Sequence, residues 1–462
     1  MTQHVAVVDI GKTNAKLVLV DRDTLAELAT LTRPNTVLPG PPWPHFDVDG
    51  HWSFLLDGLR QFQAAFGIDA ISVTTHGACV ALLDRNGDLA APILDYEHTG
   101  PDVLADSYAA IRPSFTETGS PKLAGGLNIG AQLFWQFEVD PDLRGRTAQI
   151  VTYPQFWGAR LTGATATDIT SLGCHTDLWN PHLGDFSALV GTLELTDKVA
   201  PVRKPSDILG TLRPEIAEQT GLPKETPVAC GIHDSNASLL PYVLRRTPPF
   251  SVISTGTWVI AMSIGGKAVR LDPDRDTLCN VTALGQPAPS ARFMGGREHD
   301  LATGGSYPEP TFADLRDIVS EGVMLLPALA PDTGPFKGCR STWLGPEPMV
   351  GTGKRGAAVA LYLALVTAEC LSNIDHDGAI IVEGPFATNT LYLEMLSIST
   401  CSQVYRSSGT TGTSAGAAML FQGRASADPG QETPIRVSDR KSSVLGQYTT
   451  LWRQAVRQSN GT

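Results

Sequence analysis

Two short apolar runs near the middle of the chain each lead into residues that could act on a phosphate group. The run at 228–230 is followed by Asp234, and the run at 250–254 is followed by Gly256 and Thr257. A carboxylate at the end of a strand can accept the proton of an attacking hydroxyl. A glycine-containing turn between two strands lets backbone N–H groups approach phosphate oxygens closely. The two patterns together predict phosphoryl-transfer chemistry.

A second hairpin with a glycine in its turn is expected near residue 10. The β-branched runs at 5–10 and 15–20 flank the turn, and Asp9 lies near the end of the first run. The turn residues are Gly11, Lys12, Thr13 and Asn14, with Lys16 just beyond them. Such a turn alone is a weak signal. Its layout recurs around Gly256, and each hairpin opens a long mixed α/β segment. This recurrence favours two similar domains facing one cleft over a chance likeness of two common hairpins.

Length and composition favour a soluble chain of two domains, expected at residues 1–240 and 241–462. The 462 residues exceed what one core usually supports, and 42% hydrophobic with 18% charged residues is ordinary for a globular protein. A net charge of −12 argues against nucleic acid or an anionic membrane as the main partner. No apolar run approaches the roughly 20 residues of a membrane span. Residues 1–11 lack the features of a signal peptide.

The seven cysteines are scattered and include no C-x-x-C pattern, so neither a disulfide framework nor a zinc ribbon is indicated. This usage is typical of a reducing cytoplasm. Cys230 lies close to Asp234, but a small buried hydrophobic residue is a commoner role for such a cysteine than a catalytic thiol. His76, taken alone, is likewise more typical of a structural histidine than of a ligand-binding residue.

The other elements are expected where the hydrophobic spacing is regular. A buried strand is predicted at 70–75, and a helix that is apolar nearly all round at 355–373. The stretch 265–310 is expected to be loop with short elements, and the stretch 330–353 is expected to be another long loop. Further expected elements are a strand at 379–382, a helix at 391–398 capped by Thr388 or Asn389, a small-residue helix at 412–422 and a C-terminal helix.

Taken together, these motifs resemble the FGGY family of carbohydrate kinases over about residues 4–425. The resemblance rests on DIGKTNAK at 9–16, VTTHGACVALLDRNGDLAAPILDYE at 73–97, TDITSLGCHTDLWNP at 167–181, GIHDSNA at 231–237, STGTW at 254–258 and VEGPFATNTLYLEML at 382–396. It implies an α/β fold of two actin-like (ribonuclease H-like) ATPase domains flanking a central cleft. The N-terminal domain would hold the sugar and the first phosphate loop, and the C-terminal domain the second phosphate loop and the adenosine.

The resemblance also implies roles for individual residues. Asp234 corresponds to the family's catalytic aspartate, which would take the proton of a sugar hydroxyl as that oxygen attacks the γ-phosphate of ATP. Asp9 would hold Mg²⁺ through water. ATP contacts would come from Gly11, Lys12, Thr13, Asn14, Lys16, Gly256, Thr257, Gly384, Pro385 and Asn389. Sugar contacts would come from His76, Gly77, Glu97, His233 and Asp234.

The motif at 231–234 and the hairpin at 254–258 resemble those of L-fuculokinase and L-rhamnulokinase within the family. The resemblance implies phosphorylation of a terminal hydroxyl of a deoxy-ketohexose such as L-fuculose or L-rhamnulose. The residues DYE at 95–97 depart from the pattern usual at the sugar loop, and so do residues 293–300 at a linker. Another ketose or polyol, such as xylulose or ribulose, therefore stays open.

Two alternatives belong to other functional classes. One is a nucleotide-binding regulator without turnover, against which the retained Asp234 argues. The other is a hydrolase, such as an ATPase, on the same fold. The implied partners are a small-molecule sugar and ATP, and a homodimer is compatible with the resemblance.

Overall fold

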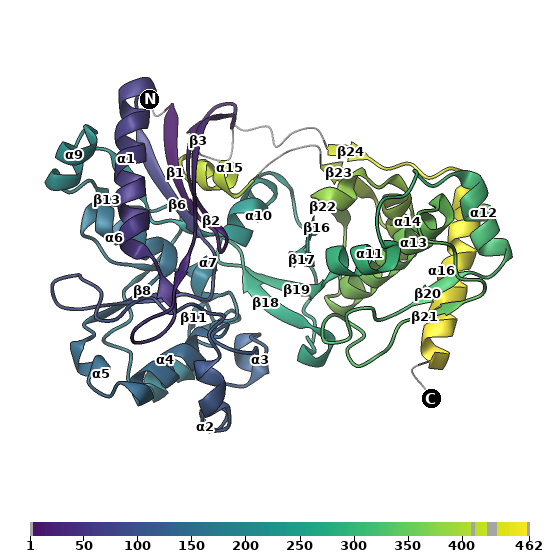
Figure 1. Cartoon of the computed structure of the whole chain (residues 1–462), viewed down its shortest axis with the longest axis horizontal. Coiled ribbons are helices and arrows are strands. Elements are labelled where there is room, and N and C mark those ends of the chain that lie inside the picture. Colours follow the sequence, from purple (N-terminus) through teal and green to yellow (C-terminus); the bar gives the residue numbers. More distant parts are fainter. Residues whose placement is uncertain (1–2, 408–411, 423–431, 460–462) are drawn as a thin grey trace. The chain divides into compact units, whose positions relative to one another are not determined.

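Two compact units make up the chain in the computed structural model, which describes residues 3–407, 412–422 and 432–459 (Figure 1). Of these, unit 1 comprises residues 3–245, 279–287 and 412–422. Unit 2 comprises the rest. Residues 412–422 therefore belong to the same unit as the N-terminal strand, from which they are separated by most of the chain.

Unit 1 is built on a mixed β-sheet whose centre is the N-terminal strand. Its strands are β1 (His4–Ile10), β2 (Asn14–Asp21), β3 (Glu27–Pro34), β6 (Ala70–Thr75), β13 (Ile208–Thr211), β14 (Pro227–Ala229) and β15 (Ile232–His233). They pair in the order β13-β14-β6-β1-β2-β3, and β15 pairs with the end of β6. β1 runs antiparallel to β2 and parallel to β6, so the ends of β1 and β6 lie at one edge. That edge carries Asp9 and His76.

Helices pack on this sheet because the side chains of β1 alternate between two apolar clusters. The helices are α1 (Val48–Phe66), α6 (Tyr153–Thr162), α9 (Pro214–Thr220), α10 (Asp234–Arg245) and α15 (Thr413–Ala418). α1, α6 and α9 pack in the cluster that contains Val8, and α10 and α15 pack in the cluster that contains Val7 (Figure 1). A side-chain carbon at Gly416 would lie 1.8 Å from the carbonyl oxygen of Ala237. Glycine therefore allows α15 to pack this closely on α10.

The rest of unit 1 is a region of short elements with its own apolar cluster, which includes Leu133 and Leu189. Its strands are β4 (Val37–Leu38), β5 (His45–Phe46), β7 (Val80–Leu83), β8 (Gln149–Thr152), β9 (Thr167–Asp168), β10 (Trp179–Asn180), β11 (Asp185–Phe186) and β12 (Val202–Arg203). Its helices are α2 (Ala105–Ala109), α3 (Phe115–Thr118), α4 (Ile129–Val139), α5 (Leu143–Arg146), α7 (Ile169–Leu172) and α8 (Ala188–Thr192).

The sheet of unit 2 repeats the strand pattern of unit 1. Its strands are β16 (Phe250–Thr255), β17 (Val259–Ile264), β19 (Pro287–Phe293), β22 (Ala379–Glu383), β23 (Val404–Ser407) and β24 (Glu432–Pro434). β18 (Thr277–Val281) pairs at the edge of this sheet, and its residues from 279 onward are counted with unit 1. The run β19-β17-β16-β22-β23 has the same order and directions as β3-β2-β1-β6-β14. The β16–β17 hairpin thus takes the place of the β1–β2 hairpin. The repeat predicted from the two glycine turns is confirmed.

Unit 2 is covered by α11 (Gly295–Thr303), α12 (Phe312–Ser320), α13 (Gly353–Asn373), α14 (Thr390–Thr400) and α16 (Asp439–Ser459), with a small hairpin of β20 (Met324–Leu326) and β21 (Thr342–Leu344). Within the described residues, α13 is the one helix long and apolar enough to cross a membrane. However, 83% of its apolar window is buried inside the protein. It is therefore the central core helix that its all-round apolar pattern predicts.

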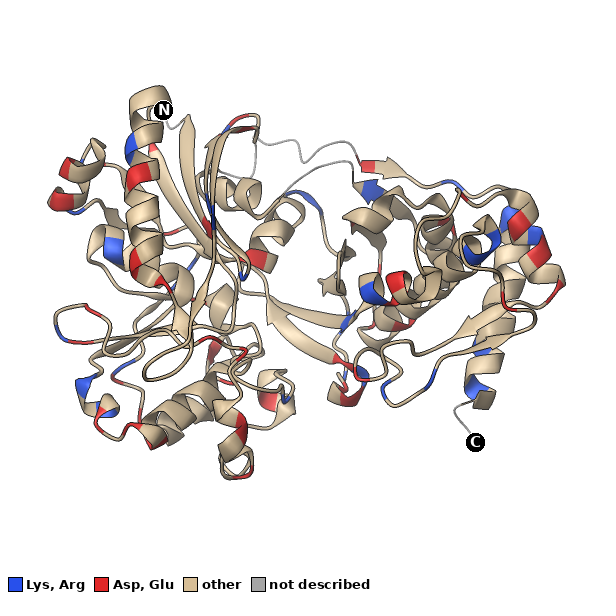
Figure 2. Ribbon diagram, viewed as in Figure 1, with Lys and Arg blue, Asp and Glu red and all other residues tan. Residues whose placement is uncertain are grey.

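Surface charges of both signs occur on the helices of each unit, as α1 and α12 illustrate (Figure 2). Pairs such as Asp57 with Arg60 and Arg316 with Asp317 are well exposed. Exposed ion pairs contribute little to stability, about 0–1 kcal/mol each. The apolar clusters therefore dominate the stability of both units.

The stretch 265–310, predicted to be loop with short elements, contains two strands and a helix of five to nine residues. β18 and β19 form a hairpin that extends the sheet along β17, and α11 follows directly. The buried positions of β19 include small residues such as Ala288, Ser290 and Ala291, which give a weak hydrophobic alternation. Pairing with β17, rather than local sequence, makes this segment a strand. In the stretch 330–353, the strand β21 interrupts the predicted loop.

Candidate active site

The turn between β1 and β2 is held in shape by the protein and leaves its tip exposed. The N–H of Gly11 donates to the carbonyl of Asn14 at 2.9 Å, and the side chain of Asn35 donates to the carbonyl of Gly11 at 2.8 Å. Thr13 and Asn14 are exposed, as is Lys16 on β2 opposite Asp9. The turn is therefore pre-formed and accessible. Its contact with phosphate stays a prediction.

Lys12 turns from this loop toward the residues predicted to contact sugar. Its ammonium group forms ion pairs with Asp95 and, at 3.2 Å, with Glu97. It also lies 4.6 Å from the centre of the Tyr96 ring. Two carboxylates thus offset the charge of Lys12, and Lys12 joins the first predicted phosphate loop to the loop at 95–97. The spacing of the sequence did not indicate Asp95 as a partner.

Asp9 is buried at the end of β1 and is held by two hydroxyl groups of α15. Thr413 donates to its Oδ2 at 2.6 Å and Ser414 donates to the same atom at 3.2 Å. Burial raises the pKa of Asp9. The hydrogen bond from Thr413 opposes this rise, whereas the nearby charge of Asp234 adds to it. The two carboxylates predicted to act in the reaction therefore lie close enough to influence one another.

Asp234 is the first residue of α10, directly after β15. Its Oδ1 accepts from the N–H of Ser235 at 2.6 Å and lies 3.4 Å from Nε2 of His233. The side chain of Asp234 is 30% exposed, so a ligand can reach it. Burial raises the pKa of Asp234, and His76 and the hydrogen bonds from Ser235 oppose that rise. A raised pKa makes a carboxylate a better proton acceptor near neutral pH.

His76 and His233 are buried beside Asp234 and are uncharged at neutral pH. Burial lowers the pKa of each to about 4. A side-chain carbon at Gly77 would lie 2.5 Å from Nε2 of His233, so this position needs glycine. Glu97 is the most exposed member of the predicted sugar set, with 65% of its side chain accessible. Unit 1 thus brings together all the residues expected to contact sugar.

Unit 2 contains a cavity of about 900 Å³ lined by Gly256, Thr257, Pro385 and Asn389. This volume is within the range of small-molecule sites. Gly384 adjoins the cavity with φ of 81°, and a side-chain carbon there would lie 2.0 Å from the carbonyl oxygen of Thr255. Four of the five predicted nucleotide-contacting residues of unit 2 therefore line one cavity, and the fifth shapes its wall.

Asn389 caps α14 as predicted. Its Oδ1 accepts from the N–H of Tyr392 at 3.0 Å. The side chain of Asn389 also lines the cavity, where its amide nitrogen can donate a hydrogen bond to a ligand.

Residues of α11 form another part of the cavity wall. This helix lies within the stretch 265–310, which was predicted to be loop with short elements. The N–H of Gly296 donates to the carbonyl of Thr257 at 3.2 Å, so the start of α11 adjoins the glycine turn. Arg297, His299 and Asp300 line the cavity from this helix, together with Tyr307 beyond it. In the sequence, residues 293–300 stand out only as a departure from the pattern of related kinases.

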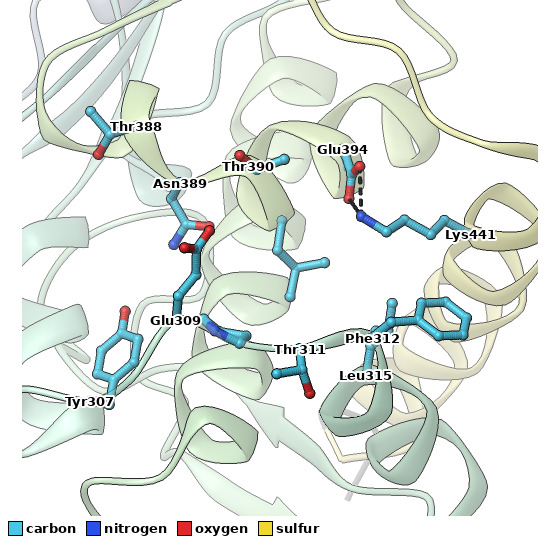
Figure 3. Close-up of a pocket in the computed structure, with 12 residues that line it drawn as sticks. Tyr307, Glu309, Thr311, Phe312, Leu315, Thr388, Asn389, Thr390, Glu394 and Lys441 are labelled. Carbon is cyan, nitrogen blue, oxygen red and sulfur yellow. Dashed lines mark hydrogen bonds and ion pairs between the residues drawn. The ribbon is translucent and has the colours of Figure 1, made fainter.

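A second cavity of about 530 Å³ adjoins the first and shares Tyr307, Thr388 and Asn389 with it (Figure 3). Glu394 and Lys441 form an ion pair on its wall, with Nζ 2.7 Å from Oε2. Apolar side chains, including Phe312, line its other side. The two cavities therefore lie side by side at the start of α14.

The residues at Asp9 fit a magnesium ion that is shared with phosphate and water. Within residues 3–407, 412–422 and 432–459 there is no cluster of three or more His, Cys, Asp or Glu side chains able to hold a metal alone. Mg²⁺ in phosphoryl-transfer sites usually has one or two carboxylate ligands, and phosphate and water supply the rest. Both hydrogen bonds that Asp9 accepts from described residues go to Oδ2, and the negative charge of Asp234 lies close enough to raise the pKa of Asp9. Both features suit a divalent cation.

Comparison with known proteins divides the chain near residue 245, where the first stretch of unit 1 ends, and places residues 279–287 and 412–422 in the C-terminal match. The N-terminal domain of the FGGY family of carbohydrate kinases matches residues 4–241, and the carbohydrate kinase FGGY C-terminal domain matches residues 247–430. The chain belongs to the FGGY family of carbohydrate kinases. A crystal structure of a carbohydrate kinase from Novosphingobium aromaticivorans is similar over 99% of both chains, with 34% identity and a TM-score of 0.92.

Curated relatives are more distant. An L-fuculokinase of Salmonella typhi is 27% identical over 271 residues, which is 57% of each chain. A rhamnulokinase of Bacillus subtilis is 27% identical over 222 residues, covering 46% of this chain and 44% of its own. This chain thus spans about half the length of the curated relatives it matches. The predicted family and the two-domain actin-like fold are confirmed.

Proposed function

We infer that the protein is an ATP- and Mg²⁺-dependent sugar kinase that transfers the γ-phosphate to a terminal hydroxyl of a ketose. The observation that carries this inference is the position of Asp234. Its carboxylate is accessible, has a raised pKa and lies among neutral histidines beside Asp9. A base in this setting can hydrogen-bond an alcohol and accept its proton.

The reaction exchanges one bond for another at phosphorus. The substrate hydroxyl gives its proton to Asp234, its oxygen bonds to the γ-phosphorus, and the bond from that phosphorus to the β-bridging oxygen breaks to release ADP. The glycine turns at Gly11 and Gly256 would bind phosphate oxygens, and Asn389 and its cavity would bind the adenosine. Mg²⁺, held at Asp9, would offset phosphate charge. Transfer requires that the sugar bound by unit 1 and the nucleotide bound by unit 2 come within reach of each other. Bringing the two substrates together would also exclude water from the reacting groups.

The charges of the acceptor site favour an uncharged polyol or sugar. Lys12 pairs with Asp95 and Glu97, and both Lys12 and Asp234 lie close enough to His76 to influence its pKa. Such a site accepts hydroxyl hydrogens and repels a sugar carboxylate or phosphate. The names of the relatives, L-fuculokinase and rhamnulokinase, favour a deoxy-ketohexose. Xylulose, ribulose or a polyol is the next candidate. ATP as co-substrate favours action in the cytoplasm.

A coupled assay of ADP release over a panel of ketoses, aldoses and polyols tests the function. We expect release that depends on a neutral ketose and on Mg²⁺. Asp234→Asn is expected to lower kcat by about 10²–10⁴, the usual contribution of a general base, while sugar and nucleotide still bind. A loss of less than tenfold would reject Asp234 as the base. ADP release that needs no sugar would favour a hydrolase, and binding without any turnover would favour a regulator.

A further inference from the structure

A network of four buried side chains holds the backbone that leads to Asp234. Thr152, Gln155, Asp168 and Thr170 have no exposed surface. They come from the end of β8, from α6, from β9 and from α7, all within unit 1. Burying this many polar groups is costly unless each finds a partner, so the pattern of their hydrogen bonds is informative.

Two of these side chains bind backbone groups just before Asp234. Nε2 of Gln155 donates to the carbonyl of Cys230 at 2.9 Å and to that of Gly231 at 3.3 Å. The hydroxyl oxygen of Thr170 accepts from the N–H of His233 at 3.0 Å. Three of the four residues that precede Asp234 therefore have a backbone group bound by a buried side chain.

Asp168 sets the direction of the Thr170 hydroxyl. Its Oδ1 accepts from that hydroxyl and from the N–H groups of Thr170 at 2.8 Å and Ser171 at 3.2 Å. Because the hydroxyl proton points to Asp168, a lone pair of the oxygen is left for the N–H of His233. An uncharged Ser, Thr or Asn would cap α7 equally well, without the cost of a buried carboxylate. The carboxyl group of Asp168 therefore does more than cap α7, because it also orients the hydroxyl that binds the N–H of His233.

The other half of the network is linked to the first through Thr152. The N–H of Asp168 donates to Oγ1 of Thr152 at 3.3 Å, and the hydroxyl of Thr152 donates to Oε1 of Gln155. The Gln155 amide is thereby oriented with its nitrogen toward the carbonyls of Cys230 and Gly231. Linked hydrogen bonds of this kind strengthen one another in a low-dielectric interior.

The segment held in this way is short and has an unusual conformation. β15 has two residues, and its one strand partner in the described part of the chain is the end of β6. Gly231, just before it, has φ of 98°, and a side-chain carbon there would lie 2.9 Å from the carbonyl of Val73. The sheet alone gives Asp234 little support, so the direction of its carboxylate depends on what holds residues 230–233.

We propose that Asp168, Thr170 and Gln155 are positioning residues that fix the peptide at 230–233 and thereby aim Asp234 at the acceptor hydroxyl. This inference rests on the proposed role of Asp234 as base. None of the three touches the reacting atoms. Their effect is therefore on kcat, because a displacement of about 1 Å at the reacting centre costs about a hundredfold in rate.

The test compares two buried threonines. Thr170→Val keeps the shape of the side chain and removes the hydroxyl. We expect kcat to fall about 10- to 100-fold while KM for sugar and for ATP stays within about twofold. Thr170→Ser, which keeps the hydroxyl, should restore kcat to within about threefold. The control is Thr220→Val, since the buried Thr220 donates to the carbonyl of Ile216 at 2.7 Å in α9. The Thr220→Val variant should be less stable than the wild type but should keep the wild-type kcat.

A second readout does not depend on activity. Hydrogen exchange measured on a peptide covering residues 228–236 should be faster in Thr170→Val and unchanged in Thr220→Val and Asp234→Asn. If Thr170→Val does not fold, Gln155→Met replaces it with the same expectations. Equal kcat in Thr170→Val and Thr220→Val, or unchanged exchange at 228–236, would overturn the proposal. If the wild-type protein shows no sugar-dependent ADP release, the proposed function fails, and the exchange data still decide whether the network holds this segment.

Discussion

The hydroxyl of Thr413 donates a 2.6 Å hydrogen bond to Asp9, although the two residues are 404 positions apart in the chain. Thr413 is the first residue of α15, and Asp9 lies near the end of the central strand β1. A segment from near the C-terminus thus completes the site around the proposed magnesium-binding carboxylate. A buried carboxylate needs such donors, because burial without them raises its free energy.

Thr413→Val tests this contact. A hydrogen bond to a charged group contributes about 1.5–3 kcal/mol, so its loss should raise the Mg²⁺ concentration needed for half-maximal ADP release about tenfold or more. Titration of Mg²⁺ at fixed pH and saturating sugar measures this change. Ser414→Ala removes the longer bond of 3.2 Å and should have a smaller effect. Identical Mg²⁺ curves for wild type and Thr413→Val would show that Asp9 does not hold the ion.

Thr257→Val tests the nucleotide cavity of unit 2. Its exposed side chain lines the cavity beside Gly256, where the hydroxyl can donate to a phosphate oxygen. We expect the Kd of ATP to rise about tenfold and the KM of the sugar to stay unchanged. Thr388→Val is the matched control, because the hydroxyl of Thr388 lines the same cavity but already donates to the carbonyl of Pro385 at 2.8 Å. Equal weakening of ATP and sugar binding would contradict the assignment.

Comparing Gly384→Ala with Gly338→Ala separates the cost of backbone strain from the cost of a steric clash. Gly384 and Gly338 have similar φ values, 81° and 79°. An added carbon at Gly384 meets the carbonyl of Thr255 at 2.0 Å, whereas at Gly338 it meets nothing within 4 Å. Gly338→Ala should cost about 1 kcal/mol in the free energy of unfolding, and Gly384→Ala clearly more, with loss of nucleotide binding. Urea unfolding and calorimetric titration with ATP measure both effects. Equal costs would mean that the turn at Gly384 adapts easily.

The neutral histidines predict a loss of stability in mild acid. The folded-state pKa of His76 and of His233 is about 4, against an ordinary value of 6.5. Between these values the unfolded chain binds more protons than the folded chain, so the free energy of unfolding falls as pH falls from 6.5 toward 4. At pH 5 the loss is on the order of 2 kcal/mol for each histidine. Urea unfolding at pH 7 and pH 5 should show a smaller difference in His76→Gln than in the wild type. Equal differences would place a charged His76 in the folded protein.

Local sequence predicted the elements that depend on nearby residues. The hairpins around Gly11 and Gly256, the strand at 70–75, the core helix at 355–373 and the cap at Asn389 follow from periodicity, turn chemistry and capping. Position within recognised motifs indicated the candidate site residues, and each unit brings most of its own candidates close together, while their roles stay predictions. The hairpin of β18 and β19 was missed, because its small residues form a strand only when β17 offers an edge to pair with.

By itself, the sequence determined the family, the repeated strand–turn–strand layout and the candidate base Asp234, since these depend on residue type and spacing along the chain. Only the tertiary structure decided that Thr413 binds Asp9, that Asp95 binds Lys12 and that Thr170 holds the N–H of His233. Each of these contacts joins residues far apart in sequence whose neighbours give no local signal. Which buried groups meet is decided by how helices and strands pack, and that depends on the whole core at once.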